Sequence, residues 1–244
     1  MKAIVLAAGM GSRLNPHFDK TKALIEVDGR CLIEYAIAFL SESIFEEIIV
    51  VGGYQFQELS HYLSNHISKP VTLIENRCFQ LGGALSVLTA LRHTRETSFL
   101  LTNVDHVFNP NLLERLRPHF SGLTLFCDTD RPLGEDDMKI KTDRHTGSIQ
   151  SISKTLLSYD CGYIGLTYVN QSTFESYHKA LYDALLRYGP HTSAESAIQC
   201  MADSGEHPKV AHINQHNWYE IDTKEDLDKA NTALKLTPQP VIIL

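Results

Sequence analysis

The 244-residue sequence lacks the features that mark several large classes of protein. No apolar run reaches the roughly 18 to 20 residues that a membrane-spanning helix needs, and the chain begins in a strand pattern without a cleavable signal. Basic residues are few: 22 Lys and Arg stand against 29 Asp and Glu, and the formal net charge of −7 argues against a nucleic-acid-binding surface. These absences predict a cytoplasmic enzyme-like protein in which local cations hold any small anionic ligand.

Cysteine is also scarce, and its spacing excludes two kinds of cross-link. The five cysteines are odd in number and include no Cys-x-x-Cys pair. They are Cys31, Cys78, Cys127, Cys161 and Cys200. Because this spacing suits neither a disulfide framework nor a zinc site, we expect reduced and mostly buried thiols. The remaining composition, 43% hydrophobic and 21% charged, is ordinary for a soluble globular protein.

Strand and helix patterns alternate through the first half of the chain. Residues 2–8 (KAIVLAA) form a continuous apolar run, which is typical of a parallel strand buried on both faces. A helical pattern follows at 31–43 and a second buried strand at 46–53, and the alternation continues to the strand pattern at 122–128. This order predicts an α/β fold with a single-domain, Rossmann-like, doubly wound and mostly parallel sheet.

The alternation changes at about residue 128. Residues 139–153 (KIKTDRHTGSIQSIS) are typical of a hairpin of two polar strands, and residues 161–169 of a returning strand. We therefore expect one domain over residues 1–236, with a β-rich lobe inserted at about 128–168. Residues 237–244 form an apolar C-terminal tail with no evident role.

The turn after the first strand, GMGSRL at residues 9–14, has the glycine spacing of a dinucleotide-binding loop. That fingerprint needs a small residue three positions after the second glycine, where this chain has Leu14. A Walker loop is excluded because no Gly-Lys-Ser/Thr follows. Arg13, Lys20 and Lys22 follow instead. A glycine turn with exposed N–H groups and spaced cations suits a triphosphate better than a dinucleotide.

The segments LAAGMGSRL (6–14) and KTKALIEVDG (20–29) resemble the signature of nucleotidyltransferases, which activate phosphorylated small molecules with a nucleoside triphosphate. Ala23 stands where that family usually has proline. LLTNVDHVF (100–108) and NWYEIDTKEDL (217–227) are similar to the family's two acidic sites, in the forms found in phosphocholine and inositol-1-phosphate cytidylyltransferases. The resemblance implies a fold of the nucleotide-diphospho-sugar transferase type, CTP as the nucleotide and a phosphorylated small molecule as acceptor. It leaves the oligomeric state open.

The resemblance assigns catalytic and metal-binding roles to the matching residues. Asp105, Glu220 and Asp222 would hold Mg²⁺, because that ion prefers hard oxygen ligands. Arg13 would grip the β- and γ-phosphates with its planar guanidinium. Lys22 would neutralise the charge that grows on the α-phosphoryl oxygens. The attacking phosphomonoester is already largely a dianion at neutral pH, so no general base is assigned.

The resemblance also implies contacts to the nucleotide and to the acceptor. The candidates for nucleotide binding are Leu6, Ala8, Gly9, Gly11, Gly82, Gly83 and Ser86. The last three would form the wall that recognises base and ribose, although the family's asparagine is missing from this stretch. Lys154 would point at the acceptor phosphate, and Lys139 and Asp160 are candidates for acceptor binding.

Several of these residues also have a purely structural interpretation. Asp105 could cap a turn after a buried strand, and Glu220 with Asp222 could be a solvated strand end and a helix cap. The lysines of the polar strands could be solvated, and the twelve histidines, His106 included, fit no metal-binding motif and are expected on the surface or in packing. Trp218 and Tyr219 either pack a strand end or wall a site for a quaternary ammonium.

The hypothesis from sequence is a Mg²⁺-dependent cytidylyltransferase that makes a CDP-alcohol and pyrophosphate. A sugar-1-phosphate nucleotidyltransferase using UTP, GTP or dTTP is the alternative within the same class. Because Ala23 and Glu220 depart from the commonest pattern, a catalytically silent nucleotide-binding regulator also stays open. A Rossmann oxidoreductase is disfavoured by Leu14.

Overall fold

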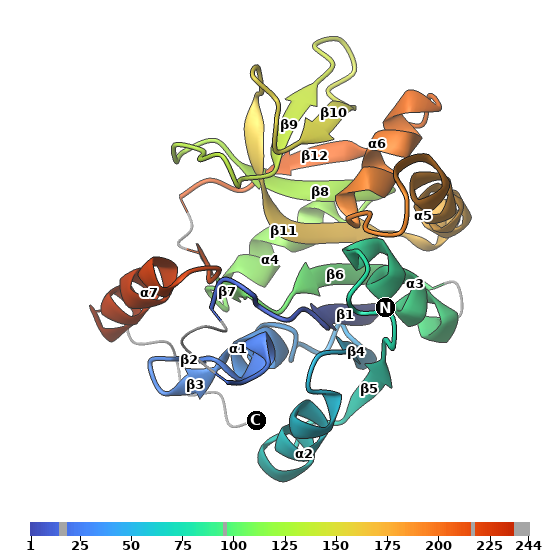
Figure 1. Ribbon diagram of the computed structural model, residues 1–244. Helices are drawn as coiled ribbons and strands as arrows, with labels where there is room; N and C mark the ends of the chain where they lie inside the picture. The colour runs from blue at the N-terminus through green and yellow to red at the C-terminus, as the bar shows by residue number, and fades with distance from the viewer. Residues whose placement is uncertain (15–18, 95–96, 216–217, 237–244) are drawn as a thin grey trace.

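The computed structural model describes residues 1–14, 19–94, 97–215 and 218–236, and a parallel sheet lies at its centre (Figure 1). Strand β1 lies between β4 and β6, and β5 extends the sheet beyond β4, all in the same direction. The bounds of these strands are Lys2–Ala7 for β1, Glu47–Gly52 for β4, Val71–Glu75 for β5 and Phe99–Asn103 for β6. Ala3, Ile4 and Val5 are completely buried, as the apolar run predicts.

The predicted lobe is part of the same sheet, which has nine strands within the described residues. Its returning strand, β11, pairs antiparallel with β6 through residues 166–169 and with β9 through residues 161–162. β9 and β10 form the predicted hairpin, while β8 pairs with β11 and is parallel to β12. The bounds are Leu123–Asp128 for β8, Lys139–Thr142 for β9, Ile149–Ser153 for β10, Cys161–Val169 for β11 and Lys209–His212 for β12.

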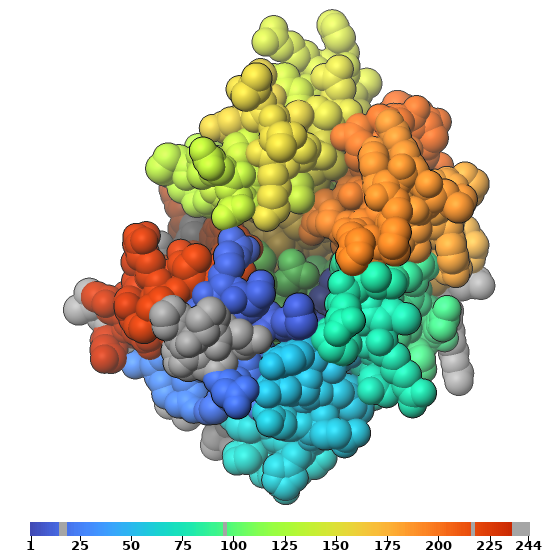
Figure 2. Space-filling view, viewed as in Figure 1, coloured from blue at the N-terminus to red at the C-terminus, as the bar shows by residue number. Residues whose placement is uncertain are grey.

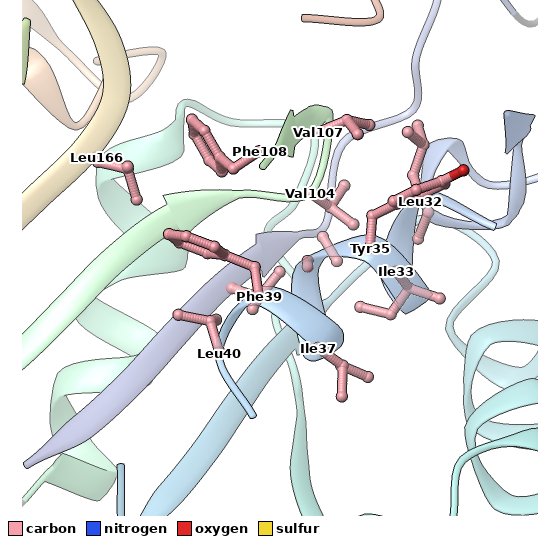
Figure 3. Packing of buried hydrophobic residues seen from close by; sticks show 14 of the residues in the cluster. Leu32, Ile33, Tyr35, Ile37, Phe39, Leu40, Val104, Val107, Phe108 and Leu166 are labelled. Atoms are coloured by element: carbon pink, nitrogen blue, oxygen red, sulfur yellow. The ribbon is translucent and has the colours of Figure 1, made fainter. Parts of the chain in front are cut away.

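Helices cover both faces of the sheet, which confirms the doubly wound prediction. Along β1, Ala3 and Val5 face one core while Ile4 faces the other, because successive strand side chains point to opposite faces. α1, α2, α4 and α7 contribute to the first core, part of which is drawn in Figure 3. α3, α5 and α6 contribute to the second. The bounds are Leu32–Phe39, Phe56–His66, Gly83–Thr94, Leu112–Leu116, Phe174–Tyr188, Glu195–Asp203 and Lys224–Leu236 for α1 to α7.

Two small antiparallel ladders complete the fold. One joins β2 (Glu26–Val27) to β3 (Arg30–Cys31), and the other joins β7 (His106–Phe108) to β13 (Trp218–Glu220). Short 3₁₀ helices cover Lys22–Leu24, Arg117–His119 and Gln171–Thr173. The β7–β13 ladder places the two acidic segments of the sequence side by side.

The C-terminal tail and the cysteines were two further expectations from the sequence. The predicted C-terminal tail, residues 237–244, lies outside the described residues. Four of the five cysteines are buried and none forms a disulfide, but Cys78 is exposed. Within the described ranges, no helix combines the length and apolar character needed to cross a bilayer.

Candidate active site

The first cleft lies where β1 and β6 end and the glycine-rich turn begins. It has a volume of about 370 Å³, and the face in Figure 2 is hollowed between the blue N-terminal segment and the green residues that lead into α3. The chain crosses from one side of β1 to the other between β5 and β6, and open α/β sheets bind ligands at such a switch point. The lining comprises Leu6, Ala8, Gly9, Gly11, Ser12, Arg13, Lys22, Phe79, Leu81, Gly83, Ser86, Asn103, Val104, Asp105 and Asp222.

The structure brings ten of the predicted site residues into this lining. They are Leu6, Ala8, Gly9, Gly11, Arg13, Lys22, Gly83, Ser86, Asp105 and Asp222. Gly11 has a φ of +60°, and a Cβ atom there would lie 3.1 Å from Cβ of Lys22. A glycine at this position therefore allows both the left-handed backbone and the close approach of the turn to the lysine stem.

Lys22 lies at the centre of the polar end of the cleft. Its side chain is 9% exposed, and its Nζ donates to Oδ2 of Asp105 and Oδ1 of Asp222, both at 2.5 Å. Burial by itself would lower the pKa of the ammonium, but the two carboxylates outweigh it and hold the pKa above its ordinary value. Lys22 is therefore a buried, permanently charged group at neutral pH.

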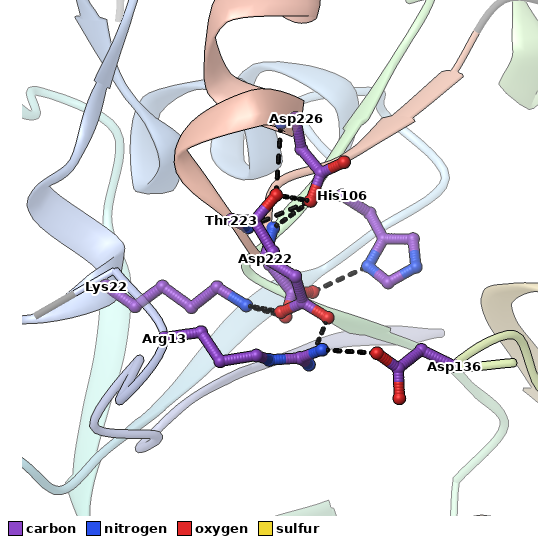
Figure 4. Close-up of polar contacts among 8 residues, drawn as sticks. Arg13, Lys22, His106, Asp136, Asp222, Thr223 and Asp226 are labelled. Atoms are coloured by element: carbon purple, nitrogen blue, oxygen red, sulfur yellow. Dashed lines mark hydrogen bonds and ion pairs between the residues drawn. The ribbon is translucent and has the colours of Figure 1, made fainter.

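Arg13 connects this centre to the loop that follows β8. Its guanidinium donates to Oδ2 of Asp222 at 2.6 Å and to Oδ2 of Asp136 at 2.9 Å (Figure 4). The Arg13 side chain is 45% exposed, so these ion pairs are screened by water and can exchange for other anions. Sequence analysis did not single out Asp136, and the acidic run at residues 135–137 is its only local signal.

A carboxylate cluster lies beside Lys22 on the β7–β13 ladder. Glu220 is opposite His106 in this ladder, and one potential ligand atom each from Asp105, His106 and Glu220 lies within 4.8 Å of the others. Burial raises the pKa of the Glu220 carboxyl, and the nearby carboxylates of Asp105 and Asp222 raise it further. Two carboxylates this close suit a divalent cation, which would offset their mutual repulsion, and the third potential ligand of the group is the imidazole of His106.

His106 has a role that the sequence analysis missed. Its Nδ1 donates to Oδ1 of Asp105 at 2.6 Å, and its ring stacks on Trp218 with centroids 5.5 Å apart. The ring also occupies the space beside Gly165, where a Cβ atom would lie 2.4 Å from Nε2. His106 thus packs in the core as expected, and it also holds the Asp105 carboxylate in place at the cleft.

Opposite charges hold Asp105 in its ionised form. Burial would raise the pKa of this carboxyl, but Lys22 and His106 lower it well below its usual range. Burial would lower the pKa of the His106 imidazole, but the contact with Asp105 outweighs this effect and raises that pKa above its ordinary value.

A second cleft of about 460 Å³ adjoins the first, and Arg13 and Asp222 line both. Its walls come from the loop after β8, from β13 and from the start of α7. The lining comprises Arg13, Arg131, Gly134, Glu135, Asp136, Asp137, Trp218, Tyr219, Glu220, Asp222, Thr223, Asp226 and Lys229. The two clefts therefore meet at an arginine and a carboxylate.

Trp218 is already engaged by protein groups in this second cleft. The Arg131 guanidinium lies 4.7 Å from the centre of its ring, and its indole N–H donates to Oδ2 of Asp128 at 2.9 Å. Together with the His106 stack, these contacts agree with the packing interpretation of Trp218. A cation–π wall for a quaternary ammonium would have to displace Arg131.

Four predicted site residues lie outside both cleft linings. Lys139 is buried, and its ammonium donates to the carbonyl oxygens of Gly134 at 2.7 Å and Lys154 at 2.8 Å. Asp160 accepts hydrogen bonds from Lys141 and Thr142, which lower its pKa to about 2, while the Lys154 side chain is exposed. These contacts stabilise the lobe and do not bring the three side chains to the cleft.

Gly82 also has a structural reason for its small size. A Cβ atom there would lie 1.9 Å from the carbonyl oxygen of Thr192. Its N–H donates to the carbonyl of Pro190, so the residue is the contact between the start of α3 and the loop before α6. Backbone packing therefore explains the glycine at position 82, and the expected contact of Gly82 with base and ribose stays a prediction.

The sheet and its clefts have the arrangement of an NTP transferase domain. The chain belongs to the family of MobA-like NTP transferase domains, whose sequence profile matches residues 3–203. The resemblance inferred from the opening motif is confirmed by this match.

Curated relatives of the chain include a bifunctional transferase, a uridylyltransferase and a cytidylyltransferase. It is 27% identical over 234 residues to the bifunctional IPC transferase and DIPP synthase of Archaeoglobus fulgidus, covering 96% of this chain and 44% of that protein. It is 38% identical over 114 residues to the UTP–glucose-1-phosphate uridylyltransferase AglF of Haloferax volcanii, covering 46% of each. A 62-residue stretch is 47% identical to choline-phosphate cytidylyltransferase of Streptococcus pneumoniae, covering 25% of this chain and 27% of that one. The chain thus spans less than half the length of these relatives.

A solved structure confirms the fold class. The inositol-1-phosphate CTP transferase from T. maritima superimposes with a TM-score of 0.80 over 98% of both chains, at 22% sequence identity. At this level of identity the similarity establishes the nucleotide-diphospho-sugar transferase type of fold.

Proposed function

We propose that this chain is a Mg²⁺-dependent cytidylyltransferase that transfers CMP from CTP to a phosphorylated small alcohol, releasing pyrophosphate. The observation that carries the proposal is the meeting of the two clefts at Arg13 and Asp222, beside the buried ammonium of Lys22. A triphosphate in the first cleft and a phosphomonoester in the second would face each other across these charges. Phosphocholine and inositol-1-phosphate are the acceptor types suggested by the similar proteins.

In-line attack on the α-phosphorus would need positioning and neutralisation of charge more than acid–base chemistry. The acceptor's phosphate oxygen would attack while the bond to the β-phosphate breaks and pyrophosphate leaves. Lys22 would stabilise the negative charge on the α-phosphoryl oxygens, and Arg13 would stabilise the leaving group. No base is needed, because the second pKa of a phosphomonoester is about 6.

Asp105, Glu220 and Asp222 would hold the metal ion. When bound, Mg²⁺ supplies a Lewis acid that neutralises phosphate oxygens. Lys22 and His106 favour the ionised form of Asp105, and the hydrogen bond from His106 would orient its carboxylate. The paired charges around Lys22 would also exchange partners as substrates bind, since a triphosphate offers oxygens to both Lys22 and Arg13.

A sugar-1-phosphate nucleotidyltransferase is the second candidate. The 38% identity to a uridylyltransferase over 114 residues favours it. Its acceptor would carry the phosphate on the anomeric carbon of a sugar ring instead of on an alcohol oxygen of choline or inositol. The polar walls of the second cleft suit such a ring as well, so the choice between the two rests on experiment.

Pyrophosphate release is the test. CTP, UTP, GTP and dTTP would each be incubated with Mg²⁺ and with phosphocholine, inositol-1-phosphate or glucose-1-phosphate. We expect release with CTP and one of the first two acceptors, and none after chelation of the metal. Turnover with UTP, GTP or dTTP alone would overturn the cytidylyltransferase proposal. Tight Mg²⁺-dependent nucleotide binding without any release would identify a silent regulator.

A further inference from the structure

Trp218, the single tryptophan of the sequence, is part of a ring stack beside the second cleft. Its indole lies nearly parallel to the imidazole of His106, at an interplanar angle of 8° and with centroids 5.5 Å apart. The indole N–H donates to Oδ2 of Asp128 at 2.9 Å, and the Arg131 guanidinium lies 4.7 Å from the ring centre. These contacts fix the tilt and the rotation of the indole, so Trp218 is a rigid support for the imidazole.

Both ring nitrogens of His106 face protein groups. Nδ1 donates to Oδ1 of Asp105 at 2.6 Å, and Nε2 lies against β11, where a Cβ atom on Gly165 would come within 2.4 Å of it. The His106 ring is buried and fills the space that a larger side chain at position 165 would take. With its nitrogens directed in this way, the imidazole is better suited to orient Asp105 than to bind an ion itself.

The ring stack connects the two clefts. Asp105 lines the first cleft and Trp218 lines the second, while His106 lies in neither lining. Of the two oxygens of the Asp105 carboxylate, Oδ2 accepts from Lys22 in the first cleft, and Oδ1 accepts from His106. Because packed side chains transmit displacement, a shift of the indole would move the imidazole and turn the carboxylate.

We propose that Trp218 and His106 form a bridge that orients Asp105 for the metal ion from the side of the acceptor cleft. Both are positioning residues: His106 acts directly on the carboxylate, and Trp218 acts through His106. Removing a hydrogen-bond partner of a metal ligand typically costs about 10- to 100-fold in metal affinity or activity. The inference rests on the proposed function, since it takes the second cleft as the acceptor site and Asp105 as a ligand of Mg²⁺.

Four variants test the bridge, and the measured quantity is the Mg²⁺ concentration that gives half-maximal turnover. His106→Leu should raise this concentration about 10- to 100-fold, because the donor to Asp105 is lost. Trp218→Leu should raise it about 3- to 10-fold, because the donor stays and only its support is lost. Trp218→Phe keeps a ring for the stack and should restore most of the wild-type value. In the double variant, Trp218→Leu should add nothing to the effect of His106→Leu, since Trp218 acts through that residue.

Phe120→Leu is the matched control. The Phe120 ring stacks on Tyr168 with centroids 4.6 Å apart, and neither residue lines either cleft. Loss of this second ring stack should therefore leave the Mg²⁺ requirement unchanged.

Tryptophan fluorescence tests the bridge without turnover. Because Trp218 is the single tryptophan, Mg²⁺ added to the wild type with CTP and no acceptor should change the emission as Asp105 turns to the ion. His106→Leu keeps the tryptophan and should lose this change, even at Mg²⁺ concentrations that saturate its turnover. The inference is overturned by an unchanged Mg²⁺ requirement in Trp218→Leu, by additive effects in the double variant, by a wild-type emission that ignores Mg²⁺, or by an unaltered emission change in His106→Leu. Failure of the proposed function is a separate result: no Mg²⁺-dependent release of pyrophosphate by the wild type with any triphosphate and acceptor.

Discussion

The buried ion-pair centre at Lys22 makes the sharpest prediction. In Lys22→Met the hydrophobic stem is retained and only the ammonium is lost, so two carboxylates lose the cation 2.5 Å away. Breaking a buried ion pair typically costs about 3–5 kcal/mol. Asp105 and Asp222 are 18% and 20% exposed and can be partly rehydrated. We therefore expect a loss of about 2–4 kcal/mol in the free energy of unfolding.

For a domain of this size the loss corresponds to a Tm roughly 4–16 °C lower. If Lys22 acts on the reacting phosphate as proposed, turnover should fall at least about 100-fold, because a preorganised positive charge is removed. Thermal melts and pyrophosphate release measure the two effects. Mg²⁺ should raise the Tm of Lys22→Met more than that of the wild type, since a divalent cation can replace the missing charge between the carboxylates.

Lys179→Met is the matched control. Lys179 pairs with Asp183 at 2.7 Å, but its side chain is 77% exposed, so the Tm and turnover should match those of the wild type. Wild-type turnover in Lys22→Met would refute the catalytic assignment of Lys22. An unchanged Tm would refute the view that the pair is a buried structural element.

Three further predictions follow from the same geometry. Asp105→Asn should lower turnover by about 1,000-fold. It should lower the free energy of unfolding less than Lys22→Met does, because Lys22 keeps its contact with Asp222. Steady-state kinetics measure the first effect and thermal melts the second. Gly82→Ala should lower the Tm, because the added Cβ atom would overlap the carbonyl oxygen of Thr192. In Gly9→Ala the Cβ atom meets open space, so the KM for the triphosphate should rise while the Tm stays unchanged. Equal Tm values for the two variants would contradict this packing. The depressed pKa of Asp105 gives stability that is present above its unfolded pKa of about 3.9 and is lost as the pH falls. Denaturant titrations from pH 6 to pH 3 should therefore show a steeper loss in the wild type than in Lys22→Met, and parallel curves would count against the pairing.

Much of the fold could be predicted because its signals are local. The apolar run at residues 2–8 specified a buried strand, and the alternation of patterns specified the doubly wound sheet. The polar hairpin at β9 and β10 was equally evident from its turn and strand periods. How this lobe joins the main sheet was not evident, because one strand, β11, divides its hydrogen bonds between β6 and β9.

The lobe residues show where local reasoning fails for the site. Lys139 and Asp160 were predicted to meet the acceptor, but a charged side chain on a polar strand can satisfy itself within the lobe. The carbonyls around residues 134–137 and 154 take the Lys139 ammonium, and Lys141 takes the Asp160 carboxylate. Asp136 was missed for the converse reason, because no motif reveals its partner Arg13.

The sequence by itself determined the glycine turn with its arginine and lysine, since the spacing of neighbouring residues sets backbone freedom and local charge. Only the tertiary structure decided what those charges face. Lys22 meets carboxylates 83 and 200 residues away, and Arg13 meets one 209 residues away. Those contacts depend on strand order and on the β7–β13 ladder, which bring distant acidic segments to one sheet edge. Long-range packing therefore made a glycine-rich turn with two cations part of a charged centre between two clefts.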